Sequence, residues 1–341
     1  MQTDKKQFVF HLCSSVFICG SILLSSFFIC GCDRKPAQEV VLYTSIDQPI
    51  AAPIVREFEQ KTGIKVTLVT DTEATKSVGL AERLRAEKAN PQADVWWSNE
   101  IFHTINLADE GVLVVGGTPE QPDVAKNLCD PQHRWAVNGM RLRVIAKHVD
   151  GPQHVTHLEQ LADPTLKGRI AMARPTAGTT GGFVASLYTK WGDQKADTFF
   201  RALHANDIKL LGGNSVVAEL VGRGQVDLGL TDNDDCDAAR GEGGKLEVIL
   251  PDQDAGGTLV VPTSIGMVSG RRTDRAIVEQ LIAFLVSREV EQKLIGAKFA
   301  YGSVREGIGQ SVKTMDVDYH AVARKMPEAV RRATAILEGR E

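Results

Sequence analysis

The feature that most constrains the fold is an alternation of short apolar strands with amphipathic helices over residues 40–111. Strands are predicted at 40–43, 64–69 and 94–97. Helical spacing of apolar residues fills the segments between and after them, at 50–62, 76–87 and 101–110, and glycine or Asn90-Pro91 ends these helices. Strands that alternate with helices of this length form a parallel sheet with helices on both faces.

The same alternation begins again near residue 168. Strands are predicted at 169–173, 226–230 and 264–268, and helices at 181–190, 196–204, 215–221, 274–287 and 327–337. A chain of 341 residues exceeds the usual size of one hydrophobic core, so we expect two α/β lobes. The chain should cross between them near 138–150 and 258–268. The expected division is 39–140 plus 265–341 for lobe 1 and 141–264 for lobe 2.

The N-terminus has the pattern of an export signal. Lys5 and Lys6 precede an apolar stretch, 7–31, that contains no Asp, Glu, Lys or Arg. An uncleaved membrane anchor is the alternative, because the stretch is long enough to cross a bilayer. Ile29-Cys30-Gly31-Cys32 resembles the lipobox of bacterial lipoproteins. It implies a signal peptide at 1–31, a lipid on Cys32, a tether at 32–38, and a location in the periplasm or on the cell surface.

Charge and cysteine content exclude some classes of partner. The formal net charge is −4, and it becomes more negative without residues 1–31, which carry Lys5, Lys6 and Asp4. No strongly basic surface for nucleic acid is therefore expected. Beyond Cys32 only Cys129 and Cys236 remain, and an oxidising compartment would allow them to pair.

The candidate ligand contacts are the polar residues that follow predicted strands. In open α/β sheets, ligands bind beyond the carboxyl ends of the strands, near the first N–H groups of the next helix. The candidates in lobe 1 are Thr44, Ser45, Asp47, Asp71, Glu73, Ser98 and Glu100. Those in lobe 2 are Thr176, Gly178, Thr179, Thr180, Asn214, Ser215, Asp232, Asp234 and Asp235.

Two groups of residues in this set indicate what kind of ligand could bind. The segment 175–182 is rich in glycine and threonine before a helix, which suits an anion, although a turn with threonine N-caps has the same composition. The acids would repel one another in a cleft unless a cation offset them, and hard cations or a polyamine would do so. Asp and Asn are also common turn and cap residues. Asp234-Asp235 is the most specific pair, because its segment shows neither a helical nor a strand pattern.

Two other pairs alternate along predicted strands. One of Trp96 and Trp97 should be core, and the other would then face the cleft as a stacking platform. Arg141 and Arg143 lie near a predicted hinge, where a ligand anion or the acids would be their partners. No HExxH, GxSxG or paired CxxC motif is present, and Gly243-Gly244-Lys245 lacks the Ser/Thr and the helix of a phosphate loop. We therefore expect no enzyme.

Several segments together resemble the extracellular solute-binding proteins of bacterial ABC importers, in their iron(III)-type branch. The resemblance covers most of 39–305 and is carried by 42–45, 58–66, 93–100, 213–217 and 262–265. It implies a two-lobed periplasmic-binding-protein fold of type II, with a mixed α/β sheet in each lobe and a two-stranded hinge. It also implies an ABC permease in the inner membrane as partner, and we expect a monomer.

The resemblance also implies a set of metal-binding residues, and this chain differs from that set. The first-loop ligand would be Asp47 and the acid after the third strand would be Glu100. The adjacent tyrosines of iron-binding members are missing, and Asp234 and Asp235 stand in their place. Tyr43, Tyr188, Tyr301 and Tyr319 lie elsewhere.

The expected function is therefore capture of a small solute for uptake. The first candidate ligand is iron(III) or another hard cation with a co-bound anion, and no other cofactor is expected. The alternative is an organic solute such as a phosphonate, a phosphate ester or a polyamine, and a surface hydrolase is a remote third.

Overall fold

The computed structural model describes residues 39–71, 77–271, 273–307, 309 and 312–341, all within one unit, Ala37–Glu341. The predicted signal peptide (1–31), the tether (32–38) with its lipid site Cys32, and Glu73 lie outside the described residues. Within the described part of the chain, no helix combines the length and the apolar character needed to cross a membrane.

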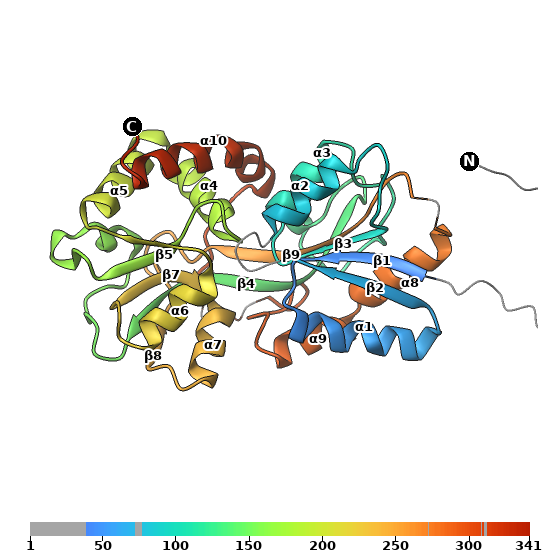
Figure 1. Ribbon diagram of the computed structural model, residues 1–341, viewed down its shortest axis with the longest axis horizontal. Coiled ribbons are helices and arrows are strands. Elements are labelled where there is room, and N and C mark those ends of the chain that lie inside the picture. The colour runs from blue at the N-terminus through green and yellow to red at the C-terminus, as the bar shows by residue number, and fades with distance from the viewer. Residues whose placement is uncertain (1–38, 72–76, 272, 308, 310–311) are drawn as a thin grey trace, which may run out of the picture. The chain divides into compact units, whose positions relative to one another are not determined.

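Lobe 1 has the parallel sheet that the alternation predicts. Its strands β1 (Glu39–Thr44), β2 (Lys65–Thr70) and β3 (Val95–Ser98) lie in the order β2-β1-β3. The helices of this lobe are α1 (Gln48–Thr62), α2 (Val78–Ala86), α3 (Phe102–Asp109), α8 (Arg275–Leu285) and α9 (Arg288–Gly296). α1 and α9 cover one face of the sheet, while α2 and α3 cover the other (Figure 1). Gly63, at a φ of 73°, ends α1 as the sequence predicts.

Lobe 2 repeats this layout. Its strands are β5 (Ile170–Ala173), β6 (Lys209–Leu211), β7 (Leu228–Asp232) and β8 (Leu246–Ile249), and its helices are α4 (Thr180–Trp191), α5 (Asp193–Ala205), α6 (Asn214–Gly222) and α7 (Asn233–Gly241). β7, β5 and β6 are parallel neighbours. Among the described residues, the short 3₁₀ helix η1 (Lys126–Leu128) lies between α3 and the strand that begins at Trp135, and η2 (Leu158–Ala162) and η3 (Pro164–Leu166) precede β5.

Two long antiparallel strands join the lobes. β4 (Trp135–His148) pairs with β9 (Val260–Met267) from Trp135↔Gly266 to Leu142↔Val260, with a register shift between Val137 and Met140. β9 also pairs with β3 in lobe 1, and β4 also pairs with β7 and β8 in lobe 2. The predicted two-stranded hinge is therefore confirmed, and the fold is the expected two-lobed one.

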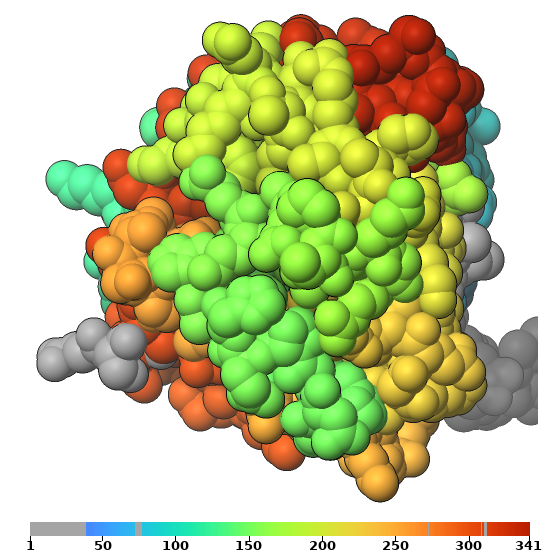
Figure 2. All heavy atoms as spheres, turned by 90° about the vertical axis from the view of Figure 1, so that its left-hand side faces the viewer, coloured from blue at the N-terminus to red at the C-terminus, as the bar shows by residue number. Residues whose placement is uncertain are grey.

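The last helix, α10 (Tyr319–Leu337), packs against α4 and α5 and also against α3. Its C-terminal residues border the α4–α5 region at the lobe 2 end of the molecule (Figure 2). The predicted start at Pro327 was wrong. The carboxylate of Asp318 caps the N–H groups of His320 and Ala321, and Pro327 lies inside the helix. The residue boundaries of the two lobes stay a prediction.

A second boundary also differs from the prediction. The segment with Asp234 and Asp235 was expected to be irregular, but these residues form the first turn of α7. Carboxylates favour this position because they lie at the positive end of the helix dipole.

Candidate functional site

A small cavity lies where the two lobes and the hinge meet. It is lined from lobe 1 by Asn99, from the hinge by Arg141, and from lobe 2 by Gly178, Gly213, Asn214, Asp232 and Asp235. The lobe 2 residues lie at the carboxyl ends of β5, β6 and β7 or at the starts of the helices that follow. This is the end of the sheet at which open α/β folds bind their ligands.

Three carboxylates of lobe 2 come together at this cavity. Asp232 is the last residue of β7, and Asp234 and Asp235 belong to the first turn of α7. One oxygen from each lies within 4.8 Å of the others, and all three side chains are buried. We call these residues the acid cluster. Among the described residues, no other group of three or more His, Cys, Asp or Glu side chains has this metal-compatible spacing.

The acid cluster has a cationic partner within the protein, Arg141 of β4. Its Nη2 lies 2.6 Å from both oxygens of Asp234, its Nε lies 3.1 Å from Oδ1 of Asp234, and Nη2 lies 3.2 Å from Oδ2 of Asp232. Burial alone would lower the pKa of Arg141, but the acid cluster, Asp234 first, raises it above its ordinary value. Arg141 is therefore a permanent positive charge.

A second buried guanidinium, Arg143, organises the residues around Asp232. Arg143 Nη1 donates to Oδ1 of Asp232 (3.1 Å) and to Oδ1 of Asn214 (2.9 Å). Burial alone would raise the pKa of Asp232, but Arg141 and Arg143 hold it below its ordinary value. The sequence allowed either a ligand anion or the acids as partners of these two arginines, and the structure shows that they pair with the acids.

The glycine- and threonine-rich segment before α4 joins this network. Thr179 Oγ1 donates to Oδ2 of Asp232 (2.6 Å), and Thr180 Oγ1 donates to Oδ1 of Asn214 (3.2 Å). Gly178 has a φ of 52° and lines the cavity, so its backbone approaches the ligand space. Thr176 is exposed outside this cavity. Of the hydroxyls that were expected to bind an anion, those of Thr179 and Thr180 thus already have protein partners.

Lobe 1 contributes a polar edge to the site. The amide oxygen of Asn99 accepts hydrogen bonds from Ser45 (3.1 Å) and from Ser77, and Ser45 also reaches Ser98 (3.4 Å). Asn99 also connects the lobe to the hinge, because its backbone oxygen accepts from Nη1 of Arg141 at 3.3 Å. Thr44, another predicted contact, donates instead to the backbone oxygen of Trp97.

The acids of lobe 1 lie in helix-start positions. Glu100 accepts from the N–H groups of Phe102 (2.6 Å) and His103 (3.1 Å) at the start of α3. Burial raises the pKa of Glu100 to about 7, although these two N–H donors act in the opposite direction. Asp71 accepts from the N–H of Leu80 in α2, and Asp47 precedes α1. Among the described residues, the metal-compatible group contains none of these three.

No tryptophan or tyrosine is among the described residues that line the cavity. Trp96 and Trp97 are both fully buried, so the expectation that one faces the cleft was wrong; their indole N–H groups bond to Thr104 and Asn138. The hydroxyls of three tyrosines bond to Glu87, Asp197 and the backbone oxygen of Val260, and the fourth, Tyr301, is exposed. Cys129 and Cys236 are free thiols.

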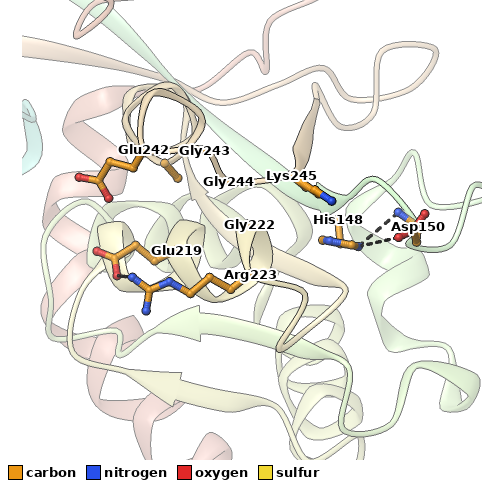
Figure 3. Close-up of a pocket in the computed structure, with 10 residues that line it drawn as sticks. His148, Asp150, Glu219, Gly222, Arg223, Glu242, Gly243, Gly244 and Lys245 are labelled. Atoms are coloured by element: carbon orange, nitrogen blue, oxygen red, sulfur yellow. Dashed lines mark hydrogen bonds and ion pairs between the residues drawn. The ribbon is translucent and has the colours of Figure 1, made fainter.

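A larger pocket lies at the opposite ends of α6 and α7. Figure 3 shows Lys245 and the His148–Asp150 pair on one side of it and the Glu219–Arg223 pair on the other. Glu219 and Arg223 balance each other's charge within the pocket. Gly243 and Gly244 lead here into β8 and not into a helix, as the sequence predicts.

Four residues of the site are absent from the ligand contacts that the sequence predicts: Asn99, Arg141, Arg143 and Gly213. The alternation of Arg141 and Arg143 was a usable signal, because side chains two apart in a strand lie on one face. This signal does not identify the partner of Arg141, because Asp234 lies 93 positions away in the sequence.

Comparison with known proteins shows consistent likenesses. The family model described as "Bacterial extracellular solute-binding protein" matches residues 39–297. Iron uptake protein A1 of Synechocystis sp. is 26% identical, with 83% of this chain and 82% of that protein covered. A ferric binding protein from Campylobacter jejuni superposes with a TM-score of 0.75 at 21% identity, covering 87% of this chain and 99% of that one. The protein AfuA from Actinobacillus pleuropneumoniae, with fructose-6-phosphate bound, gives 0.75 at 19% identity, with 88% and 98% covered.

Proposed function

This chain belongs to the family of bacterial extracellular solute-binding proteins, and we propose that it captures a small solute between its two lobes and delivers it to an ABC permease. The observation that carries the proposal is the cavity between the lobes, whose lining combines Arg141 of the hinge with Asn99 of lobe 1 and Asn214 of lobe 2. A ligand held there contacts both lobes, so its binding free energy favours the closed arrangement.

The first candidate ligand is a ferric ion that arrives with a small chelating anion such as citrate. The acid cluster supplies three carboxylates, and guanidinium groups pair with two of them, Arg141 with Asp234 and Arg143 with Asp232. A bare trivalent ion in such a site would leave excess positive charge, which a co-bound anion removes. Carboxylate oxygens suit a hard cation, and the names of the Synechocystis and Campylobacter relatives make iron the first metal to test.

The second candidate is an organic solute with an anionic group, such as a phosphate ester or a phosphonate. The observation that favours it is the pairing of Asp232 and Asp234 with guanidinium groups, which leaves them less able to hold a metal ion. The fructose-6-phosphate in AfuA belongs to this class of ligand.

We further propose that the chain is a monomer tethered to a membrane by a lipid on Cys32, which keeps it near its permease. Its family supports an extracellular or periplasmic location. The proposed ligand contacts in lobe 2 are Gly178 and Asn214 of the cavity lining and Asp234 and Asp235 of the acid cluster, and those in lobe 1 are Ser45 and Asn99.

Isothermal titration calorimetry on the purified protein tests these ligands. Ferric citrate, citrate alone, Ca²⁺, spermidine and 2-aminoethylphosphonate are titrated separately. We expect stoichiometric binding of ferric citrate and weaker binding of citrate. Binding of the phosphonate alone would favour the organic candidate, and the absence of heat from every ligand with an anionic group would contradict both candidates.

A further inference from the structure

The guanidinium of Arg141 lies where a cation would bind to the acid cluster. Its Nη2 is 2.6 Å from both oxygens of Asp234 and 3.2 Å from Oδ2 of Asp232, while Asp232, Asp234 and Asp235 offer oxygens within 4.8 Å of one another. A metal ion that bridged Asp232 and Asp234 would need the same carboxylate oxygens. The two cations therefore compete for one set of ligands.

Arg141 is held firmly in this place. Its side chain is 1% exposed, its guanidinium carbon lies 4.8 Å from the ring centre of Phe299, and its Nη1 donates to the backbone oxygen of Asn99. The backbone of Arg141 is also fixed, because this residue of β4 pairs with Val261 of β9 in the hinge. Displacing the guanidinium would break contacts to both lobes at once, so a free metal ion has to overcome more than one ion pair.

We propose that Arg141 is the specificity-determining residue of this cleft: an internal cation that excludes free metal ions and admits solutes that bring an anionic group. The inference rests on the proposed solute capture and deepens it, because it names the class of solute that the same cavity accepts. An iron–citrate chelate or a phosphate ester meets this requirement, whereas aqueous Ca²⁺ does not.

Arg143 has a different role from Arg141. Its Nη1 contacts Thr179, Asn214 and Asp232, and its Nη2 contacts Thr180 and the backbone oxygen of Leu230. All these partners belong to lobe 2, and Arg143 does not line the cavity. Arg143 is thus a positioning residue that fixes Asp232 and Asn214, while Arg141 alone of the two faces the ligand space.

The test is to remove Arg141 and to measure metal binding directly. Arg141→Met leaves the acid cluster without this guanidinium, and Arg141→Lys keeps a positive charge. Ca²⁺ and Tb³⁺ are titrated by calorimetry, and the melting temperature is recorded with and without Ca²⁺, because a ligand of the folded state raises it. We expect Arg141→Met to bind both ions at least about tenfold more tightly than the wild type, and Arg141→Lys to resemble the wild type.

A matched control removes an equivalent ion pair elsewhere. Arg134 binds Asp130 with two of its nitrogens, at 2.8 and 2.9 Å, in the connection before β4. Arg134→Met should gain no metal affinity, because Asp130 is outside the acid cluster. The double variant Arg141→Met/Asp234→Asn removes both partners and should also gain none.

Two results would overturn the inference: wild-type protein that binds Ca²⁺ as tightly as Arg141→Met does, or a folded Arg141→Met variant without metal affinity. If Arg141→Met folds poorly, a rise of its melting temperature with Ca²⁺ supports the inference, and no rise contradicts it. Failure of the proposed function is a separate outcome, since it requires that the wild type bind none of the anionic solutes, which does not affect the metal titrations.

Discussion

Gly182 of α4 in lobe 2 lies directly against Phe102 of α3 in lobe 1. A Cβ atom at position 182 would come within 2.1 Å of Cδ2 and 2.3 Å of Cε2 of the Phe102 ring. Phe102 is fully buried, and its ring also packs against Tyr319 at a centroid distance of 6.0 Å. The close approach of the two lobes at this point therefore requires a residue without a side chain at position 182.

We predict that Gly182→Ala shifts the protein toward an open arrangement of its lobes. The methyl group opposes the contact with Phe102 but leaves the core of each lobe intact. If the closed state becomes a minor species of about 10%, the apparent dissociation constant of the ligand rises about tenfold. Calorimetry measures the affinity, and small-angle X-ray scattering of the free protein should show a larger radius of gyration.

The control for this prediction is Gly296→Ala at the end of α9. A Cβ at position 296 meets nothing within 4 Å, so this variant should keep wild-type affinity and dimensions. Wild-type affinity in Gly182→Ala, together with an unchanged radius of gyration, would show that Phe102 can move aside and that the contact does not limit closure.

We predict that Asp232→Ala destabilises the folded state strongly. Asp232 is 1% exposed and pairs with both Arg141 (3.2 Å) and Arg143 (3.1 Å), so its loss leaves two buried guanidinium groups undercompensated. Removing one partner of a buried ion pair costs about 3–5 kcal/mol of unfolding free energy. Urea denaturation gives this value. Asp109→Ala, which removes the exposed partner of Arg134, should cost less than about 1 kcal/mol. Similar losses in the two variants would contradict the prediction.

Much of the fold follows from local pattern in the sequence. Buried strands such as Val95–Ser98 and helices ended by residues such as Gly63 depend on neighbouring residues only. The capping of α10 by Asp318 was not recognised, because Pro327 offered a stronger but misleading start signal. Likewise, the first turn of α7 has no apolar spacing, because its side chains include Asp234 and Asp235 of the acid cluster.

The site was predictable only in part, for a physical reason. The rule that ligands bind at the carboxyl ends of strands brought Asp232, Asn214 and Thr179 together correctly, because it depends on topology. The partners of the arginines depend on register: Arg143 of β4 lies opposite Asp232 of β7, and local patterns do not encode that pairing. The sequence therefore indicates an excess of acidic residues, and the structure shows that Arg141 and Arg143 pair with two of them, Asp234 and Asp232.

Glu100 should make the stability of the protein depend on pH. Burial raises its pKa from 4.5 to about 7 in the folded protein. Between about pH 4.5 and 7 the folded state holds a proton that the unfolded state has lost, so stability falls as pH rises through this window. At about 1.4 kcal/mol per pKa unit, the total change is about 3 kcal/mol.

The comparison of wild type with Glu100→Gln isolates this contribution. Gln cannot titrate, and its amide oxygen can still accept from the N–H of Phe102 at the start of α3. Urea denaturation across the pH series should show that the difference in unfolding free energy, wild type minus variant, decreases by about 3 kcal/mol from pH 4.5 to 7. Parallel curves for the two proteins would mean that Glu100 ionises normally in the fold.

The absence of tyrosine hydroxyls from the described cavity lining predicts an optical result. Phenolate bound to iron(III) gives a visible charge-transfer band, and none of Tyr43, Tyr188, Tyr301 and Tyr319 lines the cavity. We therefore expect ferric citrate to bind without such a band.

Asp234→Ala combined with Asp235→Ala should abolish binding, because it removes two of the three carboxylates. The variant should also be less stable than the wild type, because the buried Arg141 loses its partner Asp234, and far-ultraviolet circular dichroism checks that it is folded under the conditions of the titration. A visible band on iron binding would place a tyrosine on the metal, and unchanged affinity in the double variant would remove this acid pair from the site.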